Sequence, residues 1–462
     1  MGVDLLFGTT KISSSEVAGI LAKAESHFFD FKDKRSIPKV EKSASAFANA
    51  DGGELYVGIG DAKEKDRLSH LFKNEEDANG CVTQIFSLFN AGPEFVTCHF
   101  YEMAGRGLAI LFTIHKTPFV VRTSANRTFR RQNAQDRELT SAQELTRLEL
   151  EKGVHSYEDA KVEATPDELK TAETMRLFLE NVTPHSDLDD FLKRERLTVD
   201  GKLKACALVL YDDNPQSLMP QAAAKVYRYK TLNLEGERED LEGQPETIEG
   251  PAYEVIKKTV ARTKQIVESI PILSSSGLVS VKYPEDAIHE VICNAVLHRD
   301  YSLNDYVHVR VFDNRIEVES PGKLAGPVTV KNILKQRFAR NKKIVRLISK
   351  FPSPPNKDVG EGLNTTFKSM QELNLGRPEI VETDSSVIVR LKHEPLASKE
   401  ELIIDYLKQN GVISNTKARA VCNVQSDSVI RKIFRTMIAA GELEKVPETR
   451  GTGTKYRLPV SN

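Results

Sequence analysis

The chain has 462 residues, long enough for about three domains of roughly 150 residues each, and its hydrophobic and charged fractions of 40% and 28% are typical of an ordinary soluble globular protein. Its 65 basic and 66 acidic residues give a net charge of -1, so any nucleic-acid contact must come from local basic patches rather than from bulk charge. The five cysteines are scattered and form no CxxC pair, which argues against a disulfide framework and a zinc site and favours a reducing cytoplasm. No apolar run reaches roughly 18 residues, which argues against a membrane span.

The first predicted unit spans residues 1–150. An amphipathic helix is expected after the serines at 13–15, because Val17, Ile20 and Leu21 recur at helical spacing. The elements that follow are a strand at ESHFFDFK (25–32), a helix at VEKSASAFANA (40–50) stopped by DGG, and strands at ELYVGIGD (54–61) and LAILFTIH (108–115).

The first of these strands carries a candidate catalytic site. Alternation along residues 26–32 places Asp30 and Lys32 on one face, with Glu25 at the start of the strand. The carboxylates are suited to hold Mg²⁺ or Mn²⁺, while the ammonium of Lys32 stabilises charge developing on phosphate oxygens. Asp61, at the end of a later apolar strand, supplies a further oxygen ligand. Acid-x-Lys patterns also occur by chance on solvated faces, which is the plain alternative.

ESHFFDFK followed by SAFANADGGELYVGIGD (45–61) resembles the Schlafen-type, AlbA-related domain over residues 13–145. The resemblance implies a metal-binding nuclease site made of Glu25, Asp30 and Asp61. Asp30 stands where this family usually has Glu, and is one methylene shorter. Many members of the family are described only as nucleic-acid-binding modules, and that reading stays open.

A basic segment follows at residues 122–137. It holds five arginines against one acidic residue, and an arginine fork pairs well with phosphate oxygens. The segment is therefore either a phosphate-binding surface or a solvated loop, and the resemblance favours phosphate contact. The candidate nucleic-acid-binding residues are Arg122, Arg127, Arg130 and Arg131.

Residues 151–250 are expected to form a linker and a connecting α/β subdomain. A helix is predicted near 168–180 and a strand at ACALVLYDD (205–213). The polar, glycine-rich run at 235–250 is predicted to be an exposed loop or hairpin.

A second candidate site lies in residues 251–396, where Glu290, Asn294 and His298 fall on one side of a predicted helix. Asn294 is a candidate ligand for magnesium, and Glu290 is placed to orient a water against a γ-phosphate. Glycine turns at SPGKLAG (320–326) and DVGEGLN (358–364) follow, and a glycine pair at a helix start presents N–H groups to phosphate.

The strings EVICNAVLHRDY, NRIEVESPGKL, ARN (339–341) and GEG (360–362) resemble the GHKL-like ATPase domain of bacterial RecG-like regulators. The resemblance implies an α/β sandwich that binds ATP or another purine nucleotide. Ser320 precedes the first glycine turn, where the wider superfamily has Asp for adenine, so binding is expected rather than efficient hydrolysis. The absence of a G-x-x-x-x-G-K-[ST] loop argues against a helicase motor. The implied site residues are Glu290, Asn294, His298, Gly322, Asn341, Gly360 and Gly362.

Residues 397–462 show helical patterns at 399–411 and 424–446, then a turn-rich run at 450–459, which together predict a winged helix. Eleven basic against seven acidic residues in 399–462 favour DNA contact, and dimerisation is the alternative.

The expected fold class is thus α+β multidomain: a Schlafen-type α/β domain, a GHKL-like α/β sandwich and a C-terminal winged helix. The first functional hypothesis is a metal-dependent nuclease acting on RNA, including tRNA, or on DNA. It would be gated by nucleotide and, by resemblance, act in phage defence. The second is a nucleotide-sensing DNA-binding transcriptional regulator without catalysis. The third is an ATPase whose N-terminal domain is an adaptor. A cytoplasmic homodimer or higher homo-oligomer without membrane partners is expected.

Overall fold

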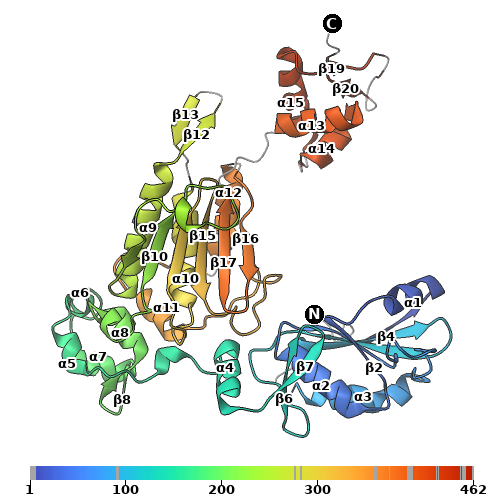
Figure 1. Cartoon of the computed structure of the whole chain (residues 1–462), viewed down its shortest axis with the longest axis horizontal. Helices are drawn as coiled ribbons and strands as arrows, with labels where there is room; N and C mark the ends of the chain where they lie inside the picture. Colours follow the sequence, from blue (N-terminus) through green and yellow to red (C-terminus); the bar gives the residue numbers. More distant parts are fainter. Residues whose placement is uncertain are drawn as a thin grey trace. The chain divides into compact units, whose positions relative to one another are not determined.

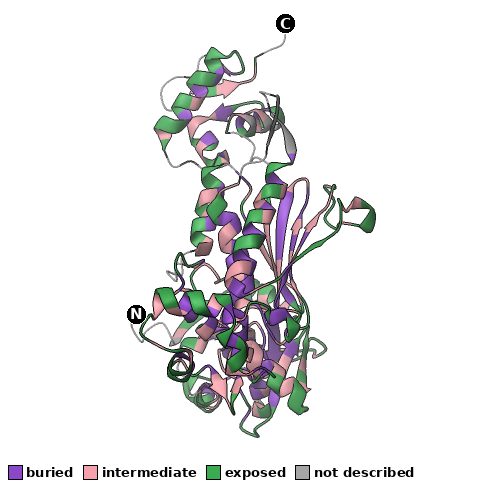
Figure 2. Ribbon diagram, turned by 90° about the vertical axis from the view of Figure 1, so that its left-hand side faces the viewer, coloured by how far each residue is buried: buried purple, intermediate pink, exposed green. Residues whose placement is uncertain are grey.

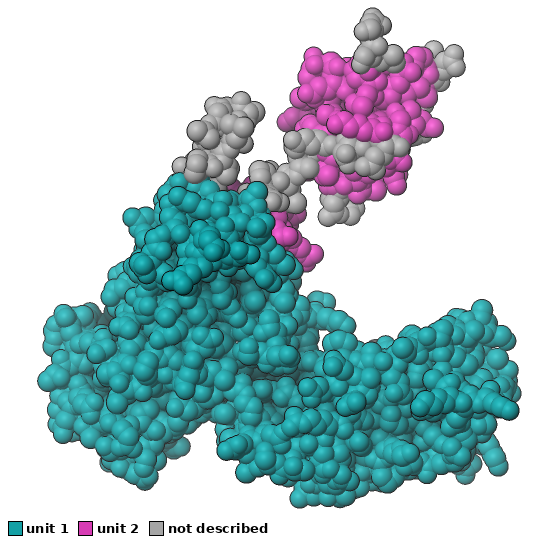
Figure 3. Space-filling view, in the orientation of Figure 1, with its two compact units in different colours: residues 1–366, 379–390 teal, residues 367–378, 391–462 magenta. Residues whose placement is uncertain are grey.

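The computed structural model divides into two compact units, residues 1–366 with 379–390 and residues 367–378 with 391–462 (Figure 3). Within its described part, no helix has the length and apolarity that crossing a membrane requires. The structure describes residues 7–89, 93–274, 277–280, 283–356, 362–373, 375–392, 399–422, 424, 426–447, 449 and 454–459.

A mixed five-stranded sheet, of which Figure 1 labels β2 and β4, organises the N-terminal domain. Its strand order is β1-β4-β5-β3-β2. β1 pairs in parallel with β4, and β2 with β3, while β5 runs antiparallel to both of its neighbours. β2, which carries the candidate catalytic residues, is therefore an edge strand. The strands are β1 (Phe7–Ile12), β2 (Phe29–Lys32), β3 (Gly53–Val57), β4 (Val96–Met103) and β5 (Leu108–Ile114).

Each face of this sheet has its own core. Phe29 and Phe31 pack with Tyr56 and with Val17 of α1 on one face, and Phe47 of α2 packs with the other. The predicted alternation holds within residues 29–32, where Asp30 points away from the two phenylalanines towards α2. The predicted strand at 25–32 begins too early, because residues 27 and 28 form a turn. The helices are α1 (Ser14–Leu21), α2 (Ile37–Ala48) and α3 (Glu75–Ser87), with a 3-10 turn η2 (Pro93–Phe95). Ser13 caps α1 in a capping box, as its serine-rich start predicts.

A β-hairpin and a helix follow the sheet in the chain. The strands β6 (Thr128–Gln132) and β7 (Gln135–Leu139) form the hairpin, which packs against α2. The arginine-rich segment therefore forms ordered structure at the edge of the domain. Helix α4 (Ala142–Lys152) then leads into a 3-10 turn, η3 (Tyr157–Asp159).

The strand predicted at 205–213 is wrong, because residues 205–211 form helix α8 (Ala205–Tyr211). All seven of its residues are buried, so the run shows no amphipathic period, and a short apolar run is then ambiguous between strand and helix. Alanine and leucine favour the helix. The neighbouring elements are α5 (Pro166–Lys170), α6 (Glu173–Val182), α7 (Leu188–Arg194), β8 (Thr198–Val199), β9 (Lys202–Leu203) and η4 (Pro215–Ser217).

A six-stranded sheet in the order β11-β10-β14-β15-β17-β16 forms the next domain, with α9 and α10 packed on it. Figure 2 shows buried residues concentrated on its central strands. Part of the loop predicted at 235–250 is an edge strand, β11. The elements are β10 (Ala224–Arg228), η5 (Arg238–Asp240), β11 (Glu246–Ile248), α9 (Ala252–Glu268), β12 (Pro271–Ser274), β13 (Gly277–Ser280), α10 (Glu285–His298), β14 (Val307–Val311), β15 (Arg315–Pro321), α11 (Lys342–Ile348), α12 (Gly362–Glu372), β16 (Glu379–Glu382) and β17 (Ser386–Lys392).

The C-terminal part of the smaller unit has a core of its own, which includes Ile403, Ile430 and Phe434. Its strands form a small sheet in the order β18-β20-β19. A helix between the two that the sequence predicts, α14, completes the packing, and the winged-helix assignment stays a prediction. The elements are α13 (Lys399–Asn410), β18 (Ile413–Ser414), α14 (Asn415–Val421), α15 (Asp427–Ala439), β19 (Glu444–Lys445) and β20 (Lys455–Arg457).

Candidate nucleic-acid and nucleotide sites

Asp30 lies at the centre of a polar cluster between the edge strand β2 and helix α2. Its side chain is fully buried, and Lys32 Nζ donates to both carboxylate oxygens, at 2.6 and 2.7 Å. Ser43 Oγ donates at 2.9 Å and Arg131 Nη1 at 3.0 Å. Two cations therefore neutralise this buried carboxylate, as burial of a charge requires.

Glu25 lies beside Asp30, and its side chain is exposed overall. Partial desolvation of its carboxyl group raises the pKa of Glu25 above its usual range, and the negative charge of Asp30 and a hydrogen bond with it raise the pKa further. Two carboxyl groups thus meet in one place with Lys32. This is the part of the predicted catalytic set that the structure brings together.

Asp61 occupies a different position. It is exposed in the loop after β3, where one carboxylate oxygen accepts a hydrogen bond from the backbone N–H of Lys63 at 2.9 Å. Among the described residues, Glu25, Asp30 and Asp61 do not form a group with ligand atoms all within 4.8 Å of one another. The metal-ligand role of Asp61 stays a prediction.

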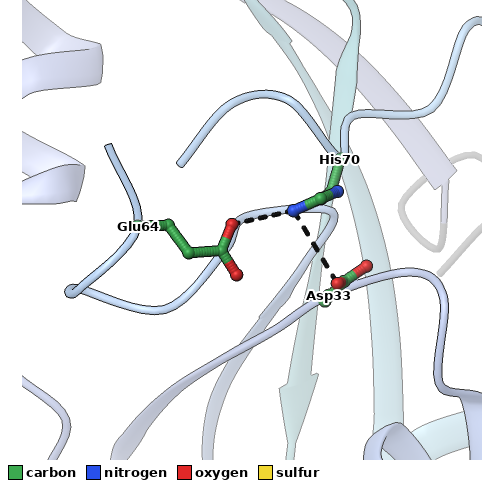
Figure 4. Close-up of side chains that lie close together, drawn as sticks. All are labelled: Asp33, Glu64 and His70. Carbon is green, nitrogen blue, oxygen red and sulfur yellow. Dashed lines mark hydrogen bonds and ion pairs between the residues drawn. The ribbon is translucent and has the colours of Figure 1, made fainter. Parts of the chain in front are cut away.

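One group of described residues does meet that distance, and the sequence did not predict it. It consists of Asp33, Glu64 and His70, which Figure 4 shows converging from three segments. His70 Nε2 lies 2.8 Å from Glu64 and 3.8 Å from Asp33. Arg35 pairs with Asp33 and lies 3.9 Å from Glu64, so the cluster is already an ion-pair network. The one available signal in the sequence was that Asp33 directly follows Lys32, a residue of the predicted catalytic set.

Three of the four predicted nucleic-acid-binding arginines have carboxylate partners. Arg127 pairs with Glu138 across the β6–β7 hairpin, and Arg130 lies 2.7 Å from Glu151. Arg131 is buried and binds Asp30 and Asp136, while the side chain of Arg122 donates to Asn126 at 3.4 Å.

Arg131 also holds the backbone of the candidate site. Its guanidinium donates to the carbonyl of Ser26 at 3.1 and 2.8 Å and to that of Phe29 at 3.1 Å. The Phe29 carbonyl also accepts from the backbone N–H of Ser26 at 2.9 Å, so Arg131 adds a second donor there and two donors at the Ser26 carbonyl. Arg131 is therefore a positioning residue for Asp30 in the structure.

A basic cavity of about 430 Å³ lies next to these residues. Lys32 and Arg131 contribute to its wall, together with two lysines of α2 that sequence reasoning missed, Lys39 and Lys42. The available signal was their i, i+3 spacing in the first two turns of a helix that directly follows ESHFFDFK.

The second candidate site is built on α10. Asn294 Nδ2 donates to the Glu290 carboxylate at 2.8 Å, one helical turn away. Gly362, the first residue of α12, lies so close to that carboxylate that a Cβ there would overlap it. The structure therefore brings Glu290, Asn294 and Gly362 together, while Gly360 lies outside the described residues.

The remaining predicted nucleotide-site residues lie near the C-terminal end of α10. Gly322 follows β15 with φ of 101°, and a Cβ there would come within 2.6 Å of Asp300 Cβ, so only glycine fits. Asn341 is buried, and its amide donates to the carbonyls of Leu297 and Arg299 at 2.9 and 2.8 Å. Asn341 thus fixes the end of α10, where His298 is the last helical residue.

Residues 25–140 match the family model described as "Schlafen, AlbA_2". Over these residues the N-terminal domain is similar to the Schlafen/AlbA_2 family. Residues 304–391 match the HATPase_c_4 model, described as "Putative ATP-dependent DNA helicase recG C-terminal". Helix α10, with Glu290 and Asn294, precedes that matched segment in the chain. Together the two matches indicate a function that involves nucleic acid and ATP.

No curated protein matches the chain significantly. One solved structure that does match is the DIP2311 protein from Corynebacterium diphtheriae. It has 16% sequence identity, a TM-score of 0.39, and coverage of 96% of each chain. A TM-score of this size fixes neither fold nor function.

Proposed function

We propose that this chain is a Schlafen-type metal-dependent nuclease that acts on RNA, including tRNA, or on DNA. The observation that carries the proposal is the meeting of Glu25 and Asp30 beside Lys32, next to a basic cavity. Paired carboxylates with a neighbouring ammonium suit the hydrolysis of a phosphodiester, in which negative charge develops on the phosphate oxygens.

The donor set fits a hard divalent cation. Mg²⁺ is usually held by one or two carboxylates, with water and substrate phosphates completing its shell, and Glu25 and Asp30 supply that number. When bound, such an ion polarises a phosphate oxygen and lowers the pKa of a bound water. Asp30 would then share its oxygens between the ion and Arg131, and Lys32 would turn towards the substrate phosphate. Asp61 is proposed as a third ligand, contributed by the loop after β3.

Cleavage assays test this proposal. Labelled tRNA, single-stranded RNA and DNA are incubated with the full-length protein and Mn²⁺, alongside Glu25→Gln, Asp30→Asn and Asp61→Asn. We expect cleavage to be lost in the first two variants, because each removes a negative charge from the proposed ligand set. Glu102→Gln on β4, whose partner Lys11 lies on the other edge strand, is the matched control. Equal cleavage by all variants, or none by the wild type, would contradict the nuclease.

We propose that the ATPase-like domain regulates this site by binding a purine nucleotide. Support comes from Glu290, which accepts a hydrogen bond from Asn294 and lies against the first residue of α12, where the N-terminal N–H groups of a helix favour phosphate. Binding of a fluorescent ATP analogue by the wild type, and its loss in Glu290→Ala and Asn294→Ala, is the expected result. A role in phage defence rests on resemblance alone and is tested by plaque assays with the Glu25→Gln variant.

A second candidate is a nucleotide-sensing DNA-binding regulator without catalysis. The observation that favours it is that Lys32 and Arg131 already neutralise Asp30, so the cluster is complete without a metal. It predicts that the protein retards promoter DNA in a gel in a sequence-specific manner, and that this retardation is lost when residues 397–462 are deleted. Retardation without Mn²⁺-dependent cleavage would select this alternative.

A further inference from the structure

We propose that Lys39 and Lys42 of helix α2 form a clamp for the phosphodiester backbone of a single polynucleotide strand. This inference rests on the proposed function and deepens it, because it names the part of the substrate that the N-terminal domain grips. The site is the cavity of about 430 Å³ between β2, α2 and the turn of the β6–β7 hairpin, which we call the α2 cavity. Its lining comprises Lys32, Lys39, Lys42, Arg131, Ala134, Gln135 and Asp136.

The charge balance of the α2 cavity identifies an anionic ligand. Four of its lining residues are basic and only Asp136 is acidic. Arg131 is balanced by Asp30 and Asp136, and Lys32 by Asp30. Among the described residues neither Lys39 nor Lys42 has a carboxylate within 4.0 Å; Glu138, the charge that interacts with Lys42 from further away, is itself paired with Arg127. Both lysine charges are therefore available to a ligand in the α2 cavity.

The positions of the two lysines suit successive contacts along a chain. They are one helical turn apart on α2, so their stems lie on the same face of the helix. Lys39 is exposed and Lys42 half-buried, with the Lys42 ammonium 5.3 Å from the centre of the Phe129 ring. That ring belongs to β6, so the hairpin fixes where the Lys42 stem can lie.

The size and the neighbours of the α2 cavity favour a single strand. A volume of about 430 Å³ falls within the range of small-ligand pockets, so the α2 cavity can admit one nucleotide unit of a single strand. Lys32 lines the α2 cavity and also touches Asp30. A phosphate held by Lys39 and Lys42 therefore shares the α2 cavity with Lys32, the side chain that contacts Asp30.

Binding without metal tests the clamp. Anisotropy of a labelled single-stranded oligonucleotide is measured in EDTA over a range of NaCl concentrations, for the wild type and for Lys39→Ala/Lys42→Ala. Each lost phosphate contact on a single strand reduces the slope of log K against log salt by about 0.7, so we expect a reduction of about 1.4. Extrapolated from 1 M, this is a loss of about 25-fold in affinity at ~0.1 M salt.

The matched control is Lys11→Ala/Lys193→Ala, which removes the same charge from β1 and α7 and should leave the slope unchanged. Lys39→Glu alone is a second variant, because an exposed position tolerates it, and it should weaken binding more than Lys39→Ala. An unchanged slope in the Lys39→Ala/Lys42→Ala variant would overturn the clamp. So would a loss of equal size in the control.

Competition with unlabelled ligands shows whether the α2 cavity recognises the phosphates of a polynucleotide strand or free inorganic phosphate. Unlabelled single strands should displace the probe more strongly as they lengthen, which supports a polynucleotide strand. Displacement by inorganic phosphate as effective as by oligonucleotide, or duplex binding as tight as single-strand binding, would overturn it. Because EDTA prevents metal-dependent cleavage, a failure of the nuclease leaves these outcomes unaffected. If the Lys39→Ala/Lys42→Ala variant still cleaves and its slope of log K against log salt is unchanged, the clamp is refuted while the proposed nuclease function stands.

Discussion

Replacement of Arg131 by methionine would remove the group that ties the hairpin to the edge strand. The side chain is buried and donates to the carboxylates of Asp30 and Asp136 at 3.0 and 2.6 Å. It also donates to the carbonyls of Ser26 and Phe29. Methionine fills much of the volume but offers no donor, so all four acceptors lose a partner.

The expected cost is large. Removing one partner of a buried ion pair costs about 3–5 kcal/mol, because the other charge stays buried without compensation. Lys32 and Ser43 still contact Asp30, which places the expected loss of unfolding free energy near ~3 kcal/mol. Since a domain has a net stability of about 5–15 kcal/mol, the N-terminal domain should melt roughly 10 °C lower.

Differential scanning calorimetry measures this, with Arg127→Met as the control. Arg127 lies on the same hairpin and pairs with Glu138, but 55% of its side chain is exposed. An exposed pair contributes about 0–1 kcal/mol, so the control should melt close to the wild type. If the Arg131→Met and Arg127→Met variants had the same melting temperature, the positioning role of Arg131 would be refuted. Arg131→Lys should fall between, because lysine keeps the charge but not the fork.

Three further outcomes follow from the contacts. Gly362→Ala should weaken nucleotide binding without loss of stability, because its methyl group displaces the flexible Glu290 carboxylate; unchanged affinity in titration calorimetry would contradict this. Burial raises the pKa of Asp51, but the hydrogen bond with His27 and the nearby lysines lower it by more, so the folded pKa lies below the usual range of an aspartate. The ionised Asp51 carboxylate therefore stabilises the fold above about pH 4, and this stabilisation is lost as pH falls through the folded pKa. Asp51→Asn should therefore flatten the dependence of the melting temperature on pH below about pH 4, and an equally steep dependence would refute it. Residues 399–459 have their own core and should unfold cooperatively as an isolated fragment, followed by circular dichroism; a fragment without a cooperative transition would contradict this.

The sequence predicted what local periodicity determines. The alternation of Phe29, Asp30 and Phe31 identified both faces of β2 correctly, because a strand with one face on an apolar core leaves its polar residue on the other. Ser13 was likewise sufficient to place the start of α1. The buried helix α8 could not be predicted in this way, because residues buried on every side show no period.

The role of each cation depended on partners that the sequence does not bring together. The arginine-rich segment showed charge density but not pairing: Arg130 meets Glu151 from α4, and Arg131 meets Asp30 from β2. Lys39 and Lys42 drew no attention in the sequence, yet they are the cations left without carboxylates at the α2 cavity. Charge available for a ligand is what remains after tertiary pairing, and tertiary pairing is not a local property.

The glycine turn after β15 and the residues just beyond it are hydrogen-bonded to residues of the N-terminal domain and of α4. Lys116 of the N-terminal domain is buried, and its ammonium donates to the carbonyls of Leu324 and Val328 at 2.8 and 3.1 Å. The backbone N–H of Gly326 donates to the carbonyl of Glu151 at 3.1 Å. A nucleotide that displaces this turn must therefore break or rearrange bonds to the N-terminal domain. Coupling between two sites requires a ligand to bind two arrangements of a shared element with different affinities, and this turn is an element that both domains hold.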